Sequence, residues 1–146
     1  MHPQRNRRIA FVVDDEKIIA STAALILSHN GFDARPFFDP IDALRAMQSD
    51  SPDLLVTDVI MPNMSGIQLA LQIREFCPAC KVLLSSGQSM TTELLAKAAE
   101  QGHCFEIVAK PVHPKALLEK IMELFGEASS LRYAGLPPLL GKCDPN

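Results

Sequence analysis

No apolar run in this sequence is long enough to cross a membrane or to form a signal peptide. The first run, Ile9–Val13, follows a short basic stretch and is ended by acidic residues, whereas a spanning helix needs about 20 apolar residues. Basic residues are also too few for a protein that works mainly on nucleic acid, because the net charge at pH 7 is -3. We therefore expect a cytoplasmic protein with no membrane association and no direct contact with nucleic acid.

Cysteine is scarce and lacks the spacing of a metal centre. Cys77 and Cys80 form one CxxC pair, but no second CxxC or HxxxH pair stands at a distance suited to zinc. This pair sits where a helical pattern gives way to a strand pattern, which is the reverse of the order in a thioredoxin-like motif. We interpret these cysteines as part of a connecting turn, with no cofactor implied.

What the sequence does contain is a regular alternation of short apolar runs with amphipathic stretches. This alternation predicts an α/β fold: a doubly wound, five-stranded parallel sheet with helices on both faces. The predicted strands are Ile9–Val13, Phe32–Phe38, Asp53–Thr57, Lys81–Ser85 and Phe105–Ala109. The predicted helices are Lys17–Asn30, Pro40–Gln48 after an Asp39 cap, a helix from Ser65 through Phe76, Thr91–Gln101, and one that Pro114 opens.

Apolar residues at helical spacing predict the buried helix faces. They are Ile18, Thr22, Leu25 and Ile26 in the first helix, Leu69, Ala70, Ile73 and Phe76 in the third, and Leu117, Leu118, Ile121, Met122 and Phe125 in the last.

A chain of 146 residues is the length of one domain. We expect a flexible N-terminus at 1–6, one domain at 7–125, and a tail or linker with prolines and glycines at 126–146. The residues after the domain are too few for a DNA-binding output module.

Four of the predicted strands end at residues that can handle a cation or a phosphoryl group. Asp14 and Asp15 follow the first strand, and Asp58 follows the third. Ser86 follows the fourth strand, and Lys110 follows the fifth. Because the carboxyl ends of parallel strands meet along one edge of a sheet, these side chains should share a pocket.

The residue types in this pocket suit Mg²⁺-assisted transfer of a phosphoryl group to an aspartate. Mg²⁺ prefers oxygen ligands and would relieve the repulsion among three carboxylates. Asp58 stands alone at a strand end, so it is the candidate nucleophile that would form an acyl-phosphate. Lys110 and Ser86 would bind the phosphoryl oxygens. We expect Glu16 to favour the start of a helix and Ser85 to point to the opposite side of its strand.

The motifs at these strand ends resemble the receiver domain of two-component response regulators, over about Arg7 to Phe125. The matching motifs are Val13-Asp14-Asp15-Glu16, Asp58-Val59-Ile60-Met61-Pro62 with Gly66, Ser86-Gly87 and Lys110-Pro111.

The resemblance implies a flavodoxin-like fold of the receiver type and a role for each site residue. Asp58 would be the phosphoacceptor, Ser86 the switch hydroxyl and Lys110 the invariant lysine. It also implies a cis Lys110–Pro111 bond, which proline makes accessible. The implied Mg²⁺ ligands are Asp14, Asp15, Asp58 and the backbone carbonyl of Ile60.

The resemblance further implies a place in a two-component system or phosphorelay. A histidine kinase or a histidine phosphotransfer protein would donate the phosphoryl group, because the site has no suitable histidine. The protein would catalyse only its own phosphorylation and dephosphorylation, and would then signal to an unknown downstream protein; a homodimer is left open. It would be either a single-domain regulator or a receiver cut from a longer chain.

One position departs from the family's pattern. Three residues before the lysine, receivers usually carry an aromatic switch residue, and this chain has Ile107. An isoleucine has no ring to turn inward. We therefore expect phosphorylation to rearrange the loop Gly87–Met90 and the start of the next helix, with Ile107 packed throughout.

Three alternative functions fit the sequence less well. An aspartyl phosphatase would need a second acid two residues after the nucleophile, where this chain has Ile60, and a capping insertion. A flavodoxin-like cofactor binder would need a Gly/Ser/Thr-rich phosphate loop after the first strand. A degenerate receiver that acts only as an interaction module would not need the complete set of site residues.

Overall fold

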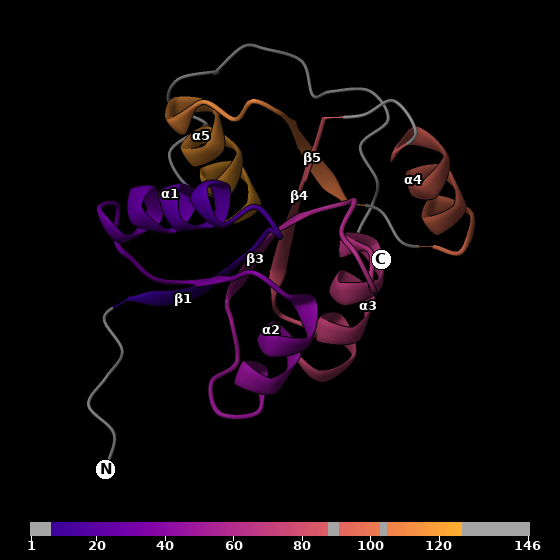
Figure 1. Cartoon of the computed structure of the whole chain (residues 1–146), viewed down its shortest axis with the longest axis horizontal. Helices are drawn as coiled ribbons and strands as arrows, with labels where there is room; N and C mark the ends of the chain where they lie inside the picture. Colours follow the sequence, from indigo (N-terminus) through magenta and orange to yellow (C-terminus); the bar gives the residue numbers. More distant parts are fainter. Residues whose placement is uncertain (1–6, 88–90, 103–104, 127–146) are drawn as a thin grey trace.

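Five parallel strands form a single sheet in the order β2-β1-β3-β4-β5 (Figure 1). The computed structural model describes residues 7–87, 91–102 and 105–126. The strands are β1 (Arg8–Val13), β2 (Phe32–Phe37), β3 (Leu54–Asp58), β4 (Lys81–Ser86) and β5 (Glu106–Ala109). The helices are α1 (Lys17–Ser28), α2 (Pro40–Met47), α3 (Gly66–Phe76), α4 (Thr91–Glu100) and α5 (Pro114–Leu124).

The predicted fold class is confirmed, and the element boundaries differ from the prediction by one or two residues. The clearest shift is in β3, which begins at Leu54 rather than at Asp53. The carboxylate of Asp53 instead accepts a hydrogen bond from the backbone N–H of Ile9 at 2.7 Å. Asp58 is consequently the last residue of the strand and not the first residue of the following loop.

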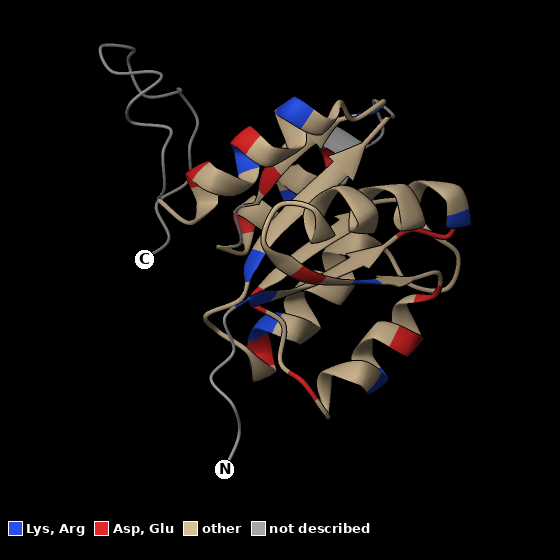
Figure 2. Cartoon of the chain, turned by 90° about the vertical axis from the view of Figure 1, so that its left-hand side faces the viewer, with Lys and Arg blue, Asp and Glu red and all other residues tan. Residues whose placement is uncertain are grey.

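The sheet separates two layers of helices, each with its own apolar core (Figure 1). Helices α1 and α5 cover one face, and α2, α3 and α4 cover the other. Because successive strand residues point to opposite faces, Phe11 of β1 packs toward α2 and α3 while Val12 packs toward α1 and α5. Four strands carry one charged residue each, at a strand end, and the edge strand β2 carries Asp33 and Arg35. Most other charged residues of the described segments lie on helices and loops (Figure 2).

The helix starts follow the predicted capping residues. The Asp39 side chain accepts a hydrogen bond from the N–H of Ile41 at 2.9 Å, with Pro40 in the first helical position. Ser65 and Gln68 form a reciprocal capping box at the start of α3. These local signals fix where α2 and α3 leave the sheet edge.

The predicted buried face of α1 is wrong. Ile18 is 81% exposed and Leu25 is 59% exposed, whereas Ala20, Ala24 and Leu27 face the sheet. Of the predicted residues, Ile26 is packed against the core. Apolar residues lie on most sides of this helix, so several stripes had helical spacing and the periodicity alone could not select one. The outer members of two other predicted stripes, Phe76 and Met122, are also exposed.

None of the described helices combines the length and the apolar character that a membrane span requires. The predicted segments at 1–6 and, except for Gly126, at 126–146 lie outside the described residues, as do Gln88–Met90, His103 and Cys104.

The two faces of α1 give a direct stability test with matched leucines. Leu27→Ala should lower the free energy of unfolding by about 3 kcal/mol, because it leaves a cavity under a fully buried side chain. Leu25→Ala, on the exposed face of the same helix, should change it by less than about 0.5 kcal/mol. Urea unfolding followed by circular dichroism measures both values. Equal losses would show that Leu25 also belongs to the core.

Candidate functional site

The sheet order brings two buried aspartates together where the direction of strand addition reverses. β1 and β3 are neighbours, and Val13 is in register with Thr57. The next residue of each strand segment, Asp14 and Asp58, therefore reaches the edge of the sheet beside the other. This is the topological switch point at which open α/β sheets place their ligands.

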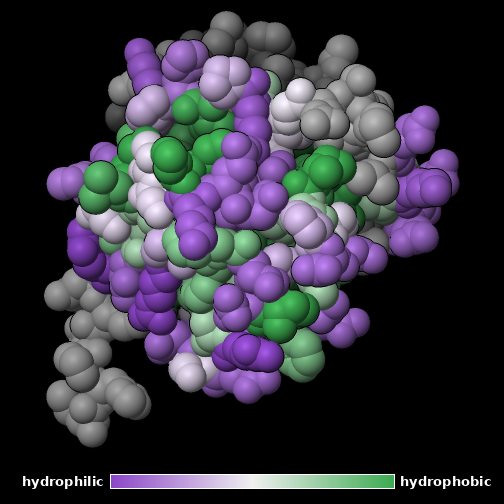
Figure 3. Space-filling view, in the orientation of Figure 1, coloured by the Kyte–Doolittle hydropathy of each residue, from purple (hydrophilic) through white to green (hydrophobic). Residues whose placement is uncertain are grey.

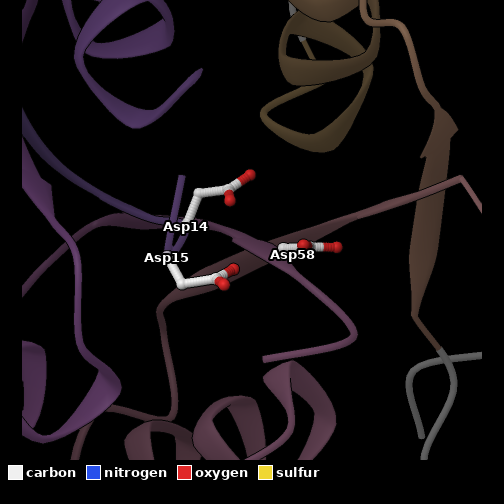
Figure 4. Close-up of side chains that lie close together, drawn as sticks. All are labelled: Asp14, Asp15 and Asp58. Carbon is white, nitrogen blue, oxygen red and sulfur yellow. The ribbon is translucent and has the colours of Figure 1, made fainter. Parts of the chain in front are cut away.

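Asp15 completes a cluster of three carboxylates. Ligand oxygens of Asp14, Asp15 and Asp58 all lie within 4.8 Å of one another. Figure 4 shows their carboxylates turned to the same side of the strand ends. Asp14 and Asp58 are buried and Asp15 is exposed, so the cluster is anchored in the protein and open to solvent.

Lys110 joins the two buried carboxylates. Its Nζ lies 3.1 Å from Asp14 Oδ2 and 3.1 Å from Asp58 Oδ2. The backbone N–H of Lys110 donates to the carbonyl of Ser86 at 2.9 Å, which ties the end of β5 to the end of β4. The Lys110–Pro111 bond is cis, as predicted.

Burial and charge shift the pKa values of this ion pair. Burial raises the pKa of Asp58 and the charge of Asp14 raises it further; together they outweigh the hydrogen bond from Lys110, which lowers it. Burial lowers the pKa of Lys110, but the hydrogen bonds to Asp14 and Asp58 more than offset this, so the lysine pKa is raised. One ammonium among three carboxylates leaves an excess of negative charge, which a cation would neutralise.

The donor set fits Mg²⁺. Three carboxylates supply hard oxygen ligands within reach of one ion, and the exposed side of the cluster leaves room for the waters that Mg²⁺ retains. The predicted contribution of the Ile60 carbonyl remains a prediction. The structure describes instead a hydrogen bond from the Ile60 backbone to the Asp58 carboxylate, which acts to lower the pKa of Asp58.

Both ends of the loop after Asp58 are held by hydrogen bonds of the Val59 backbone. The N–H of Val59 donates to the carbonyl of Ser85 at 3.1 Å, and the carbonyl of Val59 accepts from the N–H of Gly66 at 2.8 Å. Between them, Asn63 adopts a positive φ of 74°, which asparagine tolerates better than most residues. The Thr57 hydroxyl donates to the carbonyl of Asp58 at 3.0 Å. These bonds hold the backbone of Asp58 from both sides.

Gly66 lies directly against the backbone of Asp58. A Cβ at this position would overlap the Asp58 carbonyl oxygen and would come within 3.1 Å of Thr57 Cγ2. The sequence pointed to Gly66 as part of a motif but gave no reason for it. A glycine in the first turn of a helix, where most residues are better helix formers, was the available signal.

The two serines at the end of β4 differ in position. Ser85 is buried and in register with Asp58, and Ser86 is the half-buried last residue of the strand. The backbone carbonyls of both are bonded, to Val59 and Lys110 respectively. The assignment of Ser86 as the switch hydroxyl therefore stays a prediction that competes with Ser85.

Other residues with side chains that could take part in chemistry lie outside the cluster. Glu16 is the exposed N-cap residue of α1, and its N–H donates to Asp14 Oδ1 at 3.0 Å. Met61 is packed in the core, and His113 is exposed at the start of α5. Cys77 and Cys80 are buried free thiols at the turn into β4, and burial raises the pKa of Cys80 to about 12. Such a thiol is a poor nucleophile and metal ligand at neutral pH.

Sequence comparison points to one family. The family model described as "Response regulator receiver domain" matches residues 10–122. Regulatory protein VanRc of Enterococcus gallinarum is 33% identical over 113 residues, which cover 75% of this chain and 46% of that protein. The DNA-binding transcriptional regulator NtrC of Azospirillum brasilense is 29% identical over 133 residues, covering 91% of this chain and 27% of that protein. The chain thus matches less than half the length of these curated relatives.

Solved structures give the same result. A CheY-like response regulator receiver domain protein of Methanospirillum hungatei JF-1 has a TM-score of 0.74 and 25% identity, over 82% of this chain and 95% of that chain. The BeF3-activated DrrB receiver domain has a TM-score of 0.70 and 27% identity, over 83% of this chain and 99% of that chain.

The contact between Gly66 and Asp58 leads to a specific prediction. Gly66→Ala should destabilise the fold by about 2–3 kcal/mol, because neither the Asp58 carbonyl nor the start of α3 can move freely. Gly87→Ala is the matched control: its Cβ would meet only the Lys110 side chain, at 3.4 Å. Thermal and urea unfolding measure the difference, and a Gly66→Ala protein as stable as Gly87→Ala would contradict the close packing.

Proposed function

The chain belongs to the response regulator receiver domain family, and we propose that it accepts a phosphoryl group on Asp58 in a Mg²⁺-dependent reaction. One observation carries this proposal: a buried carboxylate at a strand end that a lysine contacts and that two further carboxylates face. A family assignment alone would not exclude a receiver that has lost its chemistry. The complete cluster supports a receiver that retains it.

The proposed reaction uses Asp58 as the nucleophile. A carboxylate oxygen of Asp58 attacks the phosphorus of the donor and forms an O–P bond, giving an acyl-phosphate. The bond between phosphorus and the donor's leaving atom, a histidine nitrogen or an acetate oxygen, breaks, and its electron pair remains on that atom. When bound, Mg²⁺ supplies positive charge that offsets the charge of the phosphoryl oxygens.

Lys110 contacts the two buried carboxylates before transfer and the phosphoryl oxygens after it. Before transfer its ammonium lies between Asp14 and Asp58. Transfer converts the Asp58 carboxylate to an acyl-phosphate, a mixed anhydride, and places negatively charged phosphoryl oxygens beside the lysine. The ammonium can then form charge-assisted hydrogen bonds with these oxygens. Attack of water on the same phosphorus would later release phosphate. We propose no catalysis other than this self-phosphorylation and self-dephosphorylation.

Exposed apolar side chains around the acidic cluster support a protein as the natural donor. The first turns of α1 and α2 and the loop after β3 start at the same edge of the sheet as the carboxylates. Four large apolar residues there are exposed: Ile18, Phe38, Ile41 and Ile60. An apolar rim around a charged centre is typical of a protein interaction site. We propose that a histidine kinase or a histidine phosphotransfer protein docks here.

The proposed downstream partner is a protein, and this domain itself is proposed to contact no nucleic acid. Lys and Arg alternate with Asp and Glu over the described helices, without a broad basic face in the view of Figure 2. NtrC is a DNA-binding regulator, but only 27% of its length matches this chain. We leave open a homodimer, and we propose a cytoplasmic location.

We also propose that the domain switches without an aromatic residue at position 107. Ile107 is packed against the core beside α3 and α4, and Phe105, two residues earlier, lies under the guanidinium of Arg74 at 4.7 Å. Movement should therefore centre on the loop after β4, Gly87–Met90. Of this loop only Gly87 is among the described residues. Amide chemical shifts with and without beryllofluoride test this. Large shifts at Phe105–Ile107 with a quiet Gly87 would contradict it.

The phosphoacceptor proposal predicts a single modification. After treatment with acetyl phosphate and Mg²⁺, intact-protein mass spectrometry should show one added phosphate. The addition should be absent in Asp58→Asn and strongly reduced in Asp15→Asn or without Mg²⁺, because each change removes the nucleophile or a metal ligand. Since Asp15 is exposed, its substitution should leave the fold intact. Unchanged labelling of Asp58→Asn would rule out the assignment.

The same assay separates the two serines. Ser86→Ala should slow labelling by about tenfold or more if its hydroxyl binds a phosphoryl oxygen. Ser85→Ala, which changes the neighbouring hydroxyl by the same atom, should label at nearly the rate of the unmodified chain. The reverse result would transfer the role to Ser85, the residue in register with Asp58.

A further inference from the structure

A cavity of about 500 Å³ lies between α1 and α5, beside the acidic cluster. The sheet forms its floor, α1 forms one wall, and the end of β5 with the start of α5 forms the other. In the space-filling view, hydrophobic side chains gather over the region of α1 and α5 (Figure 3). Its volume lies within the range of about 300–1,000 Å³ that small-molecule sites usually have.

The floor of the cavity consists of valines from three strands. Val12, Val56 and Val108 are 3%, 5% and 7% exposed, and they belong to the same buried cluster as Ala24 of α1 and Leu117 of α5. The cavity is thus continuous with the apolar core on this face of the sheet.

The walls of the cavity are apolar as well. Ile19, Ala23 and Ile26 of α1 line one side, and Val112 and Leu117 line the other. Ile18, at the mouth, is 81% exposed. The helix thus turns isoleucines toward an open space while its small residues contact the sheet. An arrangement that leaves branched apolar side chains in contact with water is costly unless something covers them.

One end of the cavity is polar and has a definite charge. Asp14 and Lys110 line it there, and they are joined by the ion pair described above. Asp14 belongs to a cluster with three carboxylates and one ammonium, so without bound Mg²⁺ a negatively charged group would be repelled at this end. The rest of the lining is mainly aliphatic, with hydroxyl groups from Thr22 and Ser85.

We propose that this cavity binds a small, predominantly apolar molecule that carries no negative charge. The enclosure by a sheet and two helices favours a compact ligand over an extended surface of another protein. The apolar body of the ligand would cover the valine floor and the isoleucines of α1. A neutral or positively charged hydrogen-bond donor would lie at the end next to Asp14. The cavity shares Ile18 with the apolar rim at the strand ends, and it shares Asp14 and Lys110 with the acidic cluster.

Two matched dyes test the proposal on the full chain in the absence of Mg²⁺. N-phenyl-1-naphthylamine is neutral and fluoresces in apolar surroundings, and 8-anilino-1-naphthalenesulfonate is the same ring system with a sulfonate. We expect saturable one-to-one binding of the neutral dye and at least tenfold weaker binding of the sulfonate. Val112→Phe, which fills the cavity, should weaken binding of the neutral dye at least tenfold. Leu25→Phe adds the same kind of bulk to the outer face of α1 and should leave binding unchanged.

A second variant and a direct map keep the test independent of any one substitution. Ala23→Leu fills the cavity from the other wall and should act like Val112→Phe, with thermal unfolding as the check that both variants fold. In the unmodified chain, the dye should shift the methyl resonances of Ile19 and Ile26 but not those of Ile73, which is buried on the opposite face. The proposal would be overturned if binding of the neutral dye did not saturate or if all variants bound it equally. Binding of the sulfonate that is as strong as that of the neutral dye, or dye-induced shifts at Ile73, would also overturn it. None of these readouts depends on phosphorylation of Asp58.

Discussion

The ammonium of Lys110 between Asp14 and Asp58 is the interaction on which the site depends. It connects the ends of three strands, β1, β3 and β5, across the sheet edge. Two carboxylates this deeply buried would repel each other without it, and breaking a buried ion pair by removing one partner typically costs about 3–5 kcal/mol. The same ion pair leaves negative charge in excess, which a divalent cation would neutralise. Lys110 therefore holds the two buried carboxylates together and leaves the cluster with a net negative charge.

The hydrogen bonds around the cluster extend this control from side chains to backbone. The N–H of Val59, the residue after Asp58, and the N–H of Lys110 donate to the carbonyls of Ser85 and Ser86, so the end of β4 bonds to the backbone next to Asp58 and to that of Lys110. Gly66 then brings the start of α3 against the carbonyl of Asp58. The backbone of Asp58 is consequently held by the hydrogen bonds of Thr57 and Val59 and by its contact with Gly66, while its carboxylate lies near that of the exposed Asp15. Such pre-organisation lowers the cost of reaching a productive geometry.

Much of this could be predicted from the sequence because it depends on local patterns and on one topological rule. The alternation of strands and helices predicted the parallel sheet, and the strand ends predicted that Asp14, Asp15, Asp58 and Lys110 would meet. The orientation of α1 could not be predicted in this way, because a helix with apolar residues on most sides has no unique buried face. The role of Gly66 could not be predicted either, because it depends on how closely the start of α3 approaches the backbone of Asp58. The choice between Ser85 and Ser86 turns on strand register at a sheet edge, which a sequence pattern does not resolve.

The loop that starts and ends at Val59 has a consequence for how this domain can vary. Its two ends are already joined by a hydrogen bond, from Gly66 to the carbonyl of Val59 at 2.8 Å. The entropy of closing a loop grows only slowly with its length, so an insertion beside the exposed Asn63 should cost little stability. Change nearer the two ends is limited by Met61, which packs in the core, and by Ser65, which caps α3. The tip of the loop can therefore vary in length while Asp58 stays in place.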